Sequence, residues 1–149
     1  MSLNWSGGLK ESARQWANEL LKSCGQGLYH EKQSKYGENL AANVGSGSWG
    51  AMKDADDIVS RFVEDEADKE WPANAHLTQC LWRATKYVGC YDAEKDMGDG
   101  KTCRVQVCRY AKAGNCDMHN FNDSKRMDAV MQDSSNCGLE CPPEGCSVL

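Results

Sequence analysis

The residues of this chain best equipped for chemistry are two histidines, His30 and His76, and the acids that accompany them. An imidazole can bind a divalent metal through a ring nitrogen, or work beside a carboxylate as a general acid or base. Glu38 stands at the edge of an apolar run that begins at Leu40. A carboxylate at such an edge needs polar partners, and His30, eight residues earlier, is one candidate. The alternative for His30 is an ordinary surface histidine.

His76 begins a stretch, residues 75–85, that mixes a hydroxyl, an amide and a thiol with large apolar side chains. Leu77, Leu81 and Trp82 favour burial. The polar side chains among them require hydrogen-bond partners if they are half-buried. The stretch therefore predicts the wall of a polar site built onto a core element, which could be a short helix or a strand.

A second acid comes from the helix predicted over residues 55–70, for which Asp54 is a candidate N-cap. Its apolar stripe includes Phe62. On a 3.6-residue period Glu66 continues the centre of that stripe, and Asp65 lies at its margin. Both acids stay candidates, and helical phase favours Glu66; a solvated acid at the end of the stripe is the alternative.

The sequence holds no evident nucleophile. No Ser or Cys stands in a recognised nucleophile motif, and no His-Glu-x-x-His segment occurs. Cys80 follows His76 by four residues and could share a face with it on a helix or on a strand. A buried structural cysteine is the favoured interpretation, because free cysteines are usually buried and inert. No catalytic residue is therefore assigned.

The elements that must position these residues can be read in outline. Residues 8–23 carry apolar side chains at three- and four-residue steps and predict an amphipathic helix. Residues 87–91 and 103–110 alternate with period two, and Gly98-Asp99-Gly100 between them is a turn signal, so an antiparallel hairpin is expected. A disulfide from Cys90 to Cys108 across that hairpin is plausible.

Composition narrows the class of protein. The 149 residues suffice for one domain with a real core, and the net charge of −5 argues against nucleic-acid binding. No apolar run is long enough to span a membrane. Nine cysteines favour disulfides in an oxidising compartment over buried thiols or a zinc site. The first residues lack the features of a signal peptide, so we expect a mature or truncated segment of a secreted protein.

Three motifs carry a family resemblance. Residues 76–85, His-Leu-Thr-Gln-x-x-Trp-x-x-Thr, resemble the first signature of the CAP superfamily: the cysteine-rich secretory proteins, antigen-five allergens and plant pathogenesis-related group one proteins. Residues 107–115 are similar to the second signature, and residues 36–41 resemble the Gly-Glu-Asn segment. The resemblance implies an α+β fold, an α-β-α sandwich with a small antiparallel sheet between helical layers. It assigns residues 1–116 to the domain, and leaves residues 117–149 as a polar, cysteine-rich C-terminal extension.

The resemblance also implies a cleft lined by two histidines and two acids. By position these are His30, Glu38 and His76, with Asp65 or Glu66 as the second acid. Such a set could hold Zn²⁺ through the two imidazoles, with the acids orienting the rings. No cofactor is required by the resemblance.

Disulfides from Cys24 to Cys103 and from Cys90 to Cys108 are implied as well. Two features depart from the family. A first helix that usually precedes Leu3 is missing, and the loop before His76 is shorter than the aromatic-bearing loop of sterol-binding members.

These expectations favour a secreted, non-enzymatic binding module for a lipid, a sterol or an extracellular surface component, with a role in defence or host interaction. One alternative is a structural or defence protein whose cleft residues only hold helices to the sheet. The other is a metal-dependent peptidase that uses the same four side chains.

Overall fold

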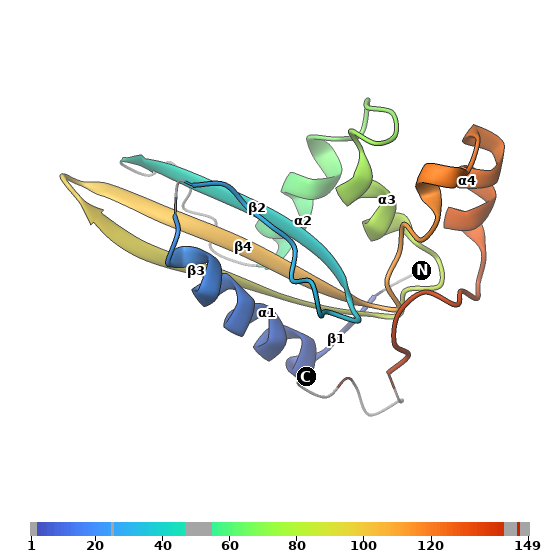
Figure 1. Ribbon diagram of the computed structural model, residues 1–149, viewed down its shortest axis with the longest axis horizontal. Coiled ribbons are helices and arrows are strands. Elements are labelled where there is room, and N and C mark those ends of the chain that lie inside the picture. The colour runs from blue at the N-terminus through green and yellow to red at the C-terminus, as the bar shows by residue number, and fades with distance from the viewer. Residues whose placement is uncertain (1–2, 25, 47–54, 142–145, 147–149) are drawn as a thin grey trace.

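The computed structural model describes residues 3–24, 26–46, 55–141 and 146 of the chain (Figure 1). In chain order the elements are β1 (Asn4–Trp5), α1 (Gly7–Leu21), β2 (Gly37–Ser46), α2 (Ala55–Glu64), α3 (Ala75–Leu81), β3 (Tyr87–Gly98), β4 (Lys101–Ala111), the 3₁₀ turn η1 (Met118–Asn120) and α4 (Asp123–Met131). None of the described helices is long and apolar enough to cross a membrane.

A four-stranded sheet with the order β1-β3-β4-β2 forms the centre of the fold. The short β1 runs parallel to β3, whereas β4 pairs antiparallel with both β2 and β3. Helix α1 lies along one face of the sheet, and α2 and α3 lie on the other side (Figure 1). The molecule is thus an α+β fold with a mixed sheet between helical layers, and β1 supplies its parallel part.

Strand alternation gives the sheet two separate cores. Leu40 of β2 and Val107 of β4 pack with the buried side of α1. Their neighbours in sequence, Ala41 and Cys108, pack on the other face with Phe62 of α2. Successive side chains of a strand point to opposite faces, so residues one position apart serve different cores.

Helix α1 begins where the sequence supplies a cap. The Ser6 hydroxyl accepts a hydrogen bond from the Leu9 backbone N–H at 3.3 Å. The predicted stripe is buried along the helix at Leu9, Ala13, Ala17 and Leu20. The backbone of α1 approaches β3 so closely that a Cβ placed at Gly89 would lie 2.3 Å from the Lys10 nitrogen. Glycine at this position therefore lets helix and sheet meet.

Helix α2 is shorter than predicted. It ends at Glu64 and not near residue 70. The backbone N–H groups of Glu66 and Ala67 bond to carbonyls three residues back, which tightens the chain into turns. These turns carry the Glu66 side chain toward α3. Asp54, the predicted N-cap, lies outside the described residues.

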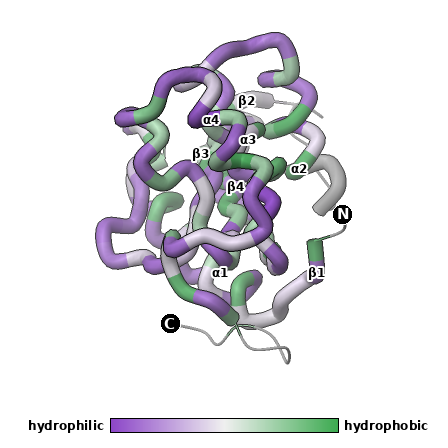
Figure 2. The backbone as a smooth tube through the Cα atoms, turned by 90° about the vertical axis from the view of Figure 1, so that its right-hand side faces the viewer, coloured by the Kyte–Doolittle hydropathy of each residue, from purple (hydrophilic) through white to green (hydrophobic). Residues whose placement is uncertain are grey.

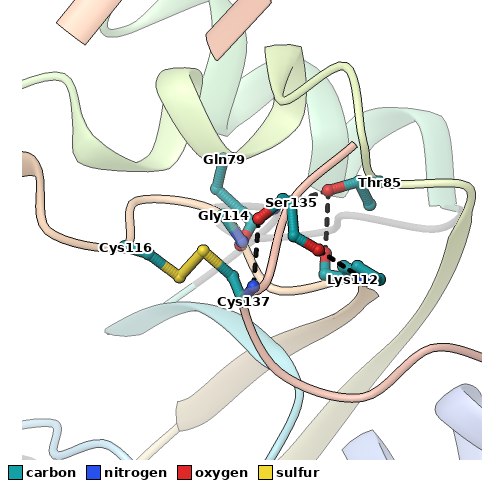
Figure 3. The surroundings of a disulfide bond; sticks show 7 residues. All are labelled: Gln79, Thr85, Lys112, Gly114, Cys116, Ser135 and Cys137. Atoms are coloured by element: carbon teal, nitrogen blue, oxygen red, sulfur yellow. Dashed lines mark hydrogen bonds between the residues drawn. A yellow bond between two sulfur atoms is a disulfide. The ribbon is translucent and has the colours of Figure 1, made fainter. Parts of the chain in front are cut away.

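The predicted C-terminal extension, residues 117–149, is tied back onto the domain. The structure joins Cys116 to Cys137, and the Lys112 ammonium donates to the Ser135 carbonyl beside that disulfide (Figure 3). Helix α4 is attached to the segment that follows α3, because the Arg83 backbone N–H donates to the Val130 carbonyl at 2.9 Å. Figure 2 looks onto this end of the molecule, where α3 and α4 lie near one another.

Four disulfides join described cysteines. Two of the pairs, Cys24–Cys103 and Cys90–Cys108, are the pairs implied by the family resemblance. Of the other two, Cys116–Cys137 ties the extension to the domain, and Cys141–Cys146 joins two residues within the extension. Cys80 is the free thiol among the cysteines that the structure describes.

Candidate functional site: two histidine–acid pairs and an apolar cavity

His76 is held by Glu66. The imidazole Nδ1 lies 2.5 Å from one carboxylate oxygen of Glu66, and the other oxygen accepts the Leu77 backbone N–H at 3.0 Å. Glu66 is buried and Asp65 is exposed. One carboxylate therefore fixes both the His76 ring and the first turn of α3 to the end of α2. Of the two candidate acids, the structure brings Glu66 to His76 and turns Asp65 away.

The remaining contacts of His76 come from α2 and the sheet. Its ring stacks on Phe62 with centroids 4.9 Å apart. Its carbonyl accepts a hydrogen bond from the Asn39 amide at 3.1 Å. The predicted wall is therefore a short helix, seated on α2 on one side and on β2 on the other.

The second signature segment holds the first in place. The Gln79 side-chain carbonyl accepts the Gly114 N–H at 2.7 Å, and its amide donates to the Thr85 hydroxyl (Figure 3). Thr85 donates in turn to the Lys112 carbonyl at 2.8 Å. A Cβ at Gly114 would lie 2.9 Å from both the Gln79 amide nitrogen and the Trp82 ring, so a larger residue here would force these side chains to move. These signature residues support the fold around His76 and make no evident catalytic array.

His30 belongs to a different network. Its Nδ1 lies 2.6 Å from a Glu38 carboxylate oxygen, and the other oxygen accepts from Arg109. The Arg109 guanidinium is fully buried and also donates to Glu31 and to the Ser34 hydroxyl. His30 itself is mostly exposed, with 71% of its side chain accessible, whereas Glu38 is 5% exposed. The hydrogen bond to Glu38 raises the pKa of His30 above its usual value, against the opposing effect of partial burial.

Sequence reasoning missed the role of Arg109. The signal was available, because Arg109 alternates with Val107 and Val105 along a buried strand face, and a buried guanidinium needs carboxylate partners. The acids that contact Arg109 are Glu31 and Glu38, which lie seven residues apart. The sequence does not indicate that this segment lies beside the strand that carries Arg109.

The two histidine–acid pairs lie on opposite faces of the sheet. Glu38 and Arg109 have the strand parity of Leu40 and Val107, which pack with α1. His76 stacks on Phe62, which packs on the other face. Among the residues that the structure describes, no three His, Cys, Asp or Glu side chains gather into a group that could hold a metal ion. Within the described part of the chain, His30 and His76 therefore do not belong to one zinc site with three or more protein ligands.

Cys80 sits beside the His76 helix with polar partners of its own. Its sulfur lies 3.3 Å from the Tyr110 hydroxyl and 3.5 Å from the Asn39 amide nitrogen. Burial raises the pKa of the Cys80 thiol, and burial also raises that of Tyr110 well above its usual value. A thiol with a raised pKa is a poor nucleophile because the thiolate is the reactive form.

A cavity of about 470 Å³ lies between α3 and α4. Its apolar wall consists of Trp71, Leu77, Leu81, Met118, Met127 and Val130. Sequence reasoning did not find this cavity, because half of these side chains belong to η1 and α4 in the extension. A second cavity, of about 520 Å³, also has Leu81 and a methionine of α4, Met131, in its wall. Leu81, Met127 and Met131 are all more than half exposed. Exposed apolar side chains gathered around a concave surface are typical of a binding site.

Comparison with known proteins places the chain in a family. Residues 1–110 match the model of CAP, the cysteine-rich secretory protein family. The chain is 33% identical over 117 residues to "Repressed by EFG1 protein 1" of Candida albicans, covering 76% of this chain and 40% of that protein. It is 32% identical over 119 residues to "Pathogenesis-related protein 1" of Arabidopsis thaliana, covering 76% of this chain and 66% of that protein. The chain thus spans less than two thirds of the length of these relatives.

The fold is similar to that of solved members. It superposes on the structure of BmVAL-1 with a TM-score of 0.58 and 26% identity, over 76% of this chain and 60% of that one. The match to the family model covers the Gly-Glu-Asn segment, which lies on β2, and the first signature, which begins on α3 with His76. The chain therefore belongs to the cysteine-rich secretory protein (CAP) family and is related to the pathogenesis-related proteins.

Proposed function

We propose that this protein is an extracellular, non-enzymatic binding module whose ligand is a lipid or a sterol held in the cavity between α3 and α4. The observation that carries the proposal is the cavity itself, with its apolar wall and its exposed methionine and leucine side chains. Methionine side chains adapt to irregular apolar ligands because they are unbranched and polarizable. Four disulfides among the described cysteines and membership of a secretory family support an extracellular location.

A non-enzymatic role agrees with the contacts of the polar residues. Both carboxylate oxygens of Glu66, and both of Glu38, make hydrogen bonds that join separate elements. The free thiol near His76 bonds to Tyr110 and Asn39. This arrangement also supports the structural alternative, in which the same side chains only stabilise the fold and the cavity takes no ligand.

The proposal is tested by lipid uptake. Purified protein is extracted with organic solvent for mass spectrometry of bound lipids, and the delipidated protein is titrated with labelled sterol and labelled fatty acid. Met127→Asp places a charge at the cavity wall, and burying that charge against an apolar ligand is unfavourable. Uptake should therefore weaken by about tenfold or more, a factor that corresponds to about 1.4 kcal/mol in binding free energy. Met97→Asp alters a comparably exposed methionine in the β3–β4 hairpin and should leave uptake unchanged. An extract without lipid, together with no uptake by the wild type, would favour the structural alternative.

Binding of a divalent metal by His30 or His76 is a second, separate proposal. It is favoured by one observation: each ring is oriented by a carboxylate at Nδ1, the arrangement that metal-binding histidines commonly show. Because the two pairs lie on opposite faces, each histidine would bind as a separate weak site. Equilibrium dialysis against Zn²⁺ tests this, with His30→Ala and His76→Ala each removing one site. Peptide hydrolysis by the wild type that is lost in His76→Ala would instead support the peptidase alternative.

A further inference from the structure

Two asparagines of the chain are followed, two positions later, by a serine. The segments are Asn4-Trp5-Ser6 and Asn122-Asp123-Ser124. In secreted proteins Asn-x-Ser, where x is not proline, is the acceptor sequence for N-linked carbohydrate. The asparagine amide takes the sugar, and the hydroxyl residue is needed for the segment to be recognised. The fold presents these two segments very differently.

The segment at Asn4 is built into the fold. Asn4 and Trp5 form β1 and pair with β3. Ser6 is only 3% exposed, and its hydroxyl accepts the backbone N–H groups of Leu9 and Cys146 at 3.3 Å each. A transferase must reach both the amide and the hydroxyl of its acceptor. The folded chain therefore does not offer this segment for modification.

The segment at Asn122 is open to solvent. Asn122, Asp123 and Ser124 are all exposed, and the Asp123 side chain is completely accessible. Asn122 is the N-cap of α4, and its Oδ1 accepts the Lys125 N–H at 3.0 Å. Because a backbone N–H needs an acceptor, this bond identifies the oxygen and leaves the amide nitrogen Nδ2 as the other atom. Within the described residues Nδ2 makes no hydrogen bond.

A sugar on Nδ2 is compatible with the structure around Asn122. The modified amide keeps its carbonyl, so Oδ1 still caps α4. The next residue, Asp123, pairs with Arg126 at 3.0 Å, and both line the α3–α4 cavity. Carbohydrate attached here stands at the rim of that cavity. The match to the family model ends at residue 110, so the acceptor segment belongs to the extension.

We propose that Asn122 carries an N-linked glycan. The inference rests on the extracellular location in the proposed function, because the donor, a polyprenyl diphosphate-linked oligosaccharide, is used in the secretory pathway. In the transfer Asn122 Nδ2 forms a bond to the anomeric carbon of the first sugar. The bond from that carbon to the diphosphate oxygen breaks, and the diphosphate leaves with the electron pair. Nδ2 gives up one of its two protons to solvent.

The test is the mass of the secreted protein. The full-length chain is produced behind a secretion leader in a eukaryotic host and collected from the medium. Its intact mass is measured before and after treatment with peptide N-glycosidase in H₂¹⁸O, which removes the glycan and leaves an ¹⁸O-labelled aspartate where the modified asparagine stood. We expect the wild type to lose the mass of one glycan, and peptide mapping to place the label at position 122.

Two substitutions at Ser124 test the motif without touching the helix cap. Ser124→Ala should abolish the glycan, whereas Ser124→Thr should retain it, because threonine also completes the acceptor sequence. Asn120→Gln is the matched control, since Asn120 is exposed, lies two residues before Asn122 and has no hydroxyl residue two positions later. The Ser124 pair keeps the test decisive even if Asn122→Gln loses the cap and fails to fold.

The outcomes separate this inference from the proposed function. A secreted wild-type chain without a glycan overturns the inference and leaves the apolar cavity and the extracellular location standing. A glycan at Asn4 in place of Asn122, or one that persists in Ser124→Ala, also overturns it. Fractionation of the source cells tests the location separately: endogenous protein found only inside the cells overturns the extracellular location, and with it the glycan on the native protein.

Discussion

Glu66 does more for the site than its sequence position suggests. Helical phase favoured it over Asp65, although α2 has already ended when the chain reaches residue 66. The stripe argument still selected the buried acid, because the turns after Glu64 keep Glu66 on the side that faces α3. What the sequence could not indicate is that one carboxylate serves both the His76 ring and a backbone N–H.

Neutralising Glu66 should therefore destabilise the fold. Glu66→Gln keeps the shape and loses a charge-assisted acceptor, and we expect a loss of about 1–3 kcal/mol in the free energy of unfolding. Asp65→Asn is the matched control, and because Asp65 is exposed its effect should stay within about 0.5 kcal/mol. Urea denaturation measures both. Equal effects of the two substitutions would contradict the assignment of Glu66.

The His30–Glu38 pair predicts a pH dependence of stability. The pKa of His30 is raised in the folded protein, so its pairing contributes fully below the unfolded value of about 6.5 and is lost as pH rises through the folded pKa. The melting temperature of the wild type should exceed that of His30→Gln most at about pH 5.5, and the difference should shrink by about pH 8. Thermal denaturation across that range, with a chelator present, is the measurement. A difference that stays constant with pH would show that His30 is not coupled to Glu38.

At the scale of elements, the sequence predicted the helices and strands whose apolar residues recur with a clear period. Helix α1 and the β3–β4 hairpin show clear three-to-four and two-residue periods, and both are present. Strand β2 was not predicted as a strand, because its adjacent residues Leu40 and Ala41 are buried on opposite faces and leave no alternation to detect. The need for glycine at a position of close approach, such as Gly89, also cannot be predicted from sequence until the packing partner is known.

The contact between α1 and β3 gives a prediction for this element pair. Gly89→Ala would place a Cβ 2.3 Å from the Lys10 nitrogen and 2.7 Å from the Leu9 carbonyl carbon, both of them backbone atoms. We expect a destabilisation of about 1–3 kcal/mol or more, because the helix must move away from the sheet. Gly7→Ala, where a Cβ would meet nothing within 4 Å, should be neutral or slightly stabilising. Chemical denaturation of both variants decides the matter.

At the scale of the whole molecule, the family domain and the extension together make the α3–α4 cavity. The three sequence motifs were enough to predict the family and the α+β fold, because each motif is a local pattern. The cavity was beyond prediction, because disulfide connectivity such as Cys116–Cys137 cannot be deduced from sequence. Without that tether the sequence gives no reason to place α4 against α3.

The central claim is that an apolar ligand binds between α3 and α4. It is tested most directly by NMR of the protein labelled with ¹³C in its methionine methyl groups, during titration with 1-hexadecanol. Met118 and Met127 line the cavity, and Met97 in the distant hairpin is the internal reference. We predict that the Met118 and Met127 signals shift with saturation while the Met97 signal stays in place. Saturable binding that leaves the Met118 and Met127 signals unmoved would contradict the account.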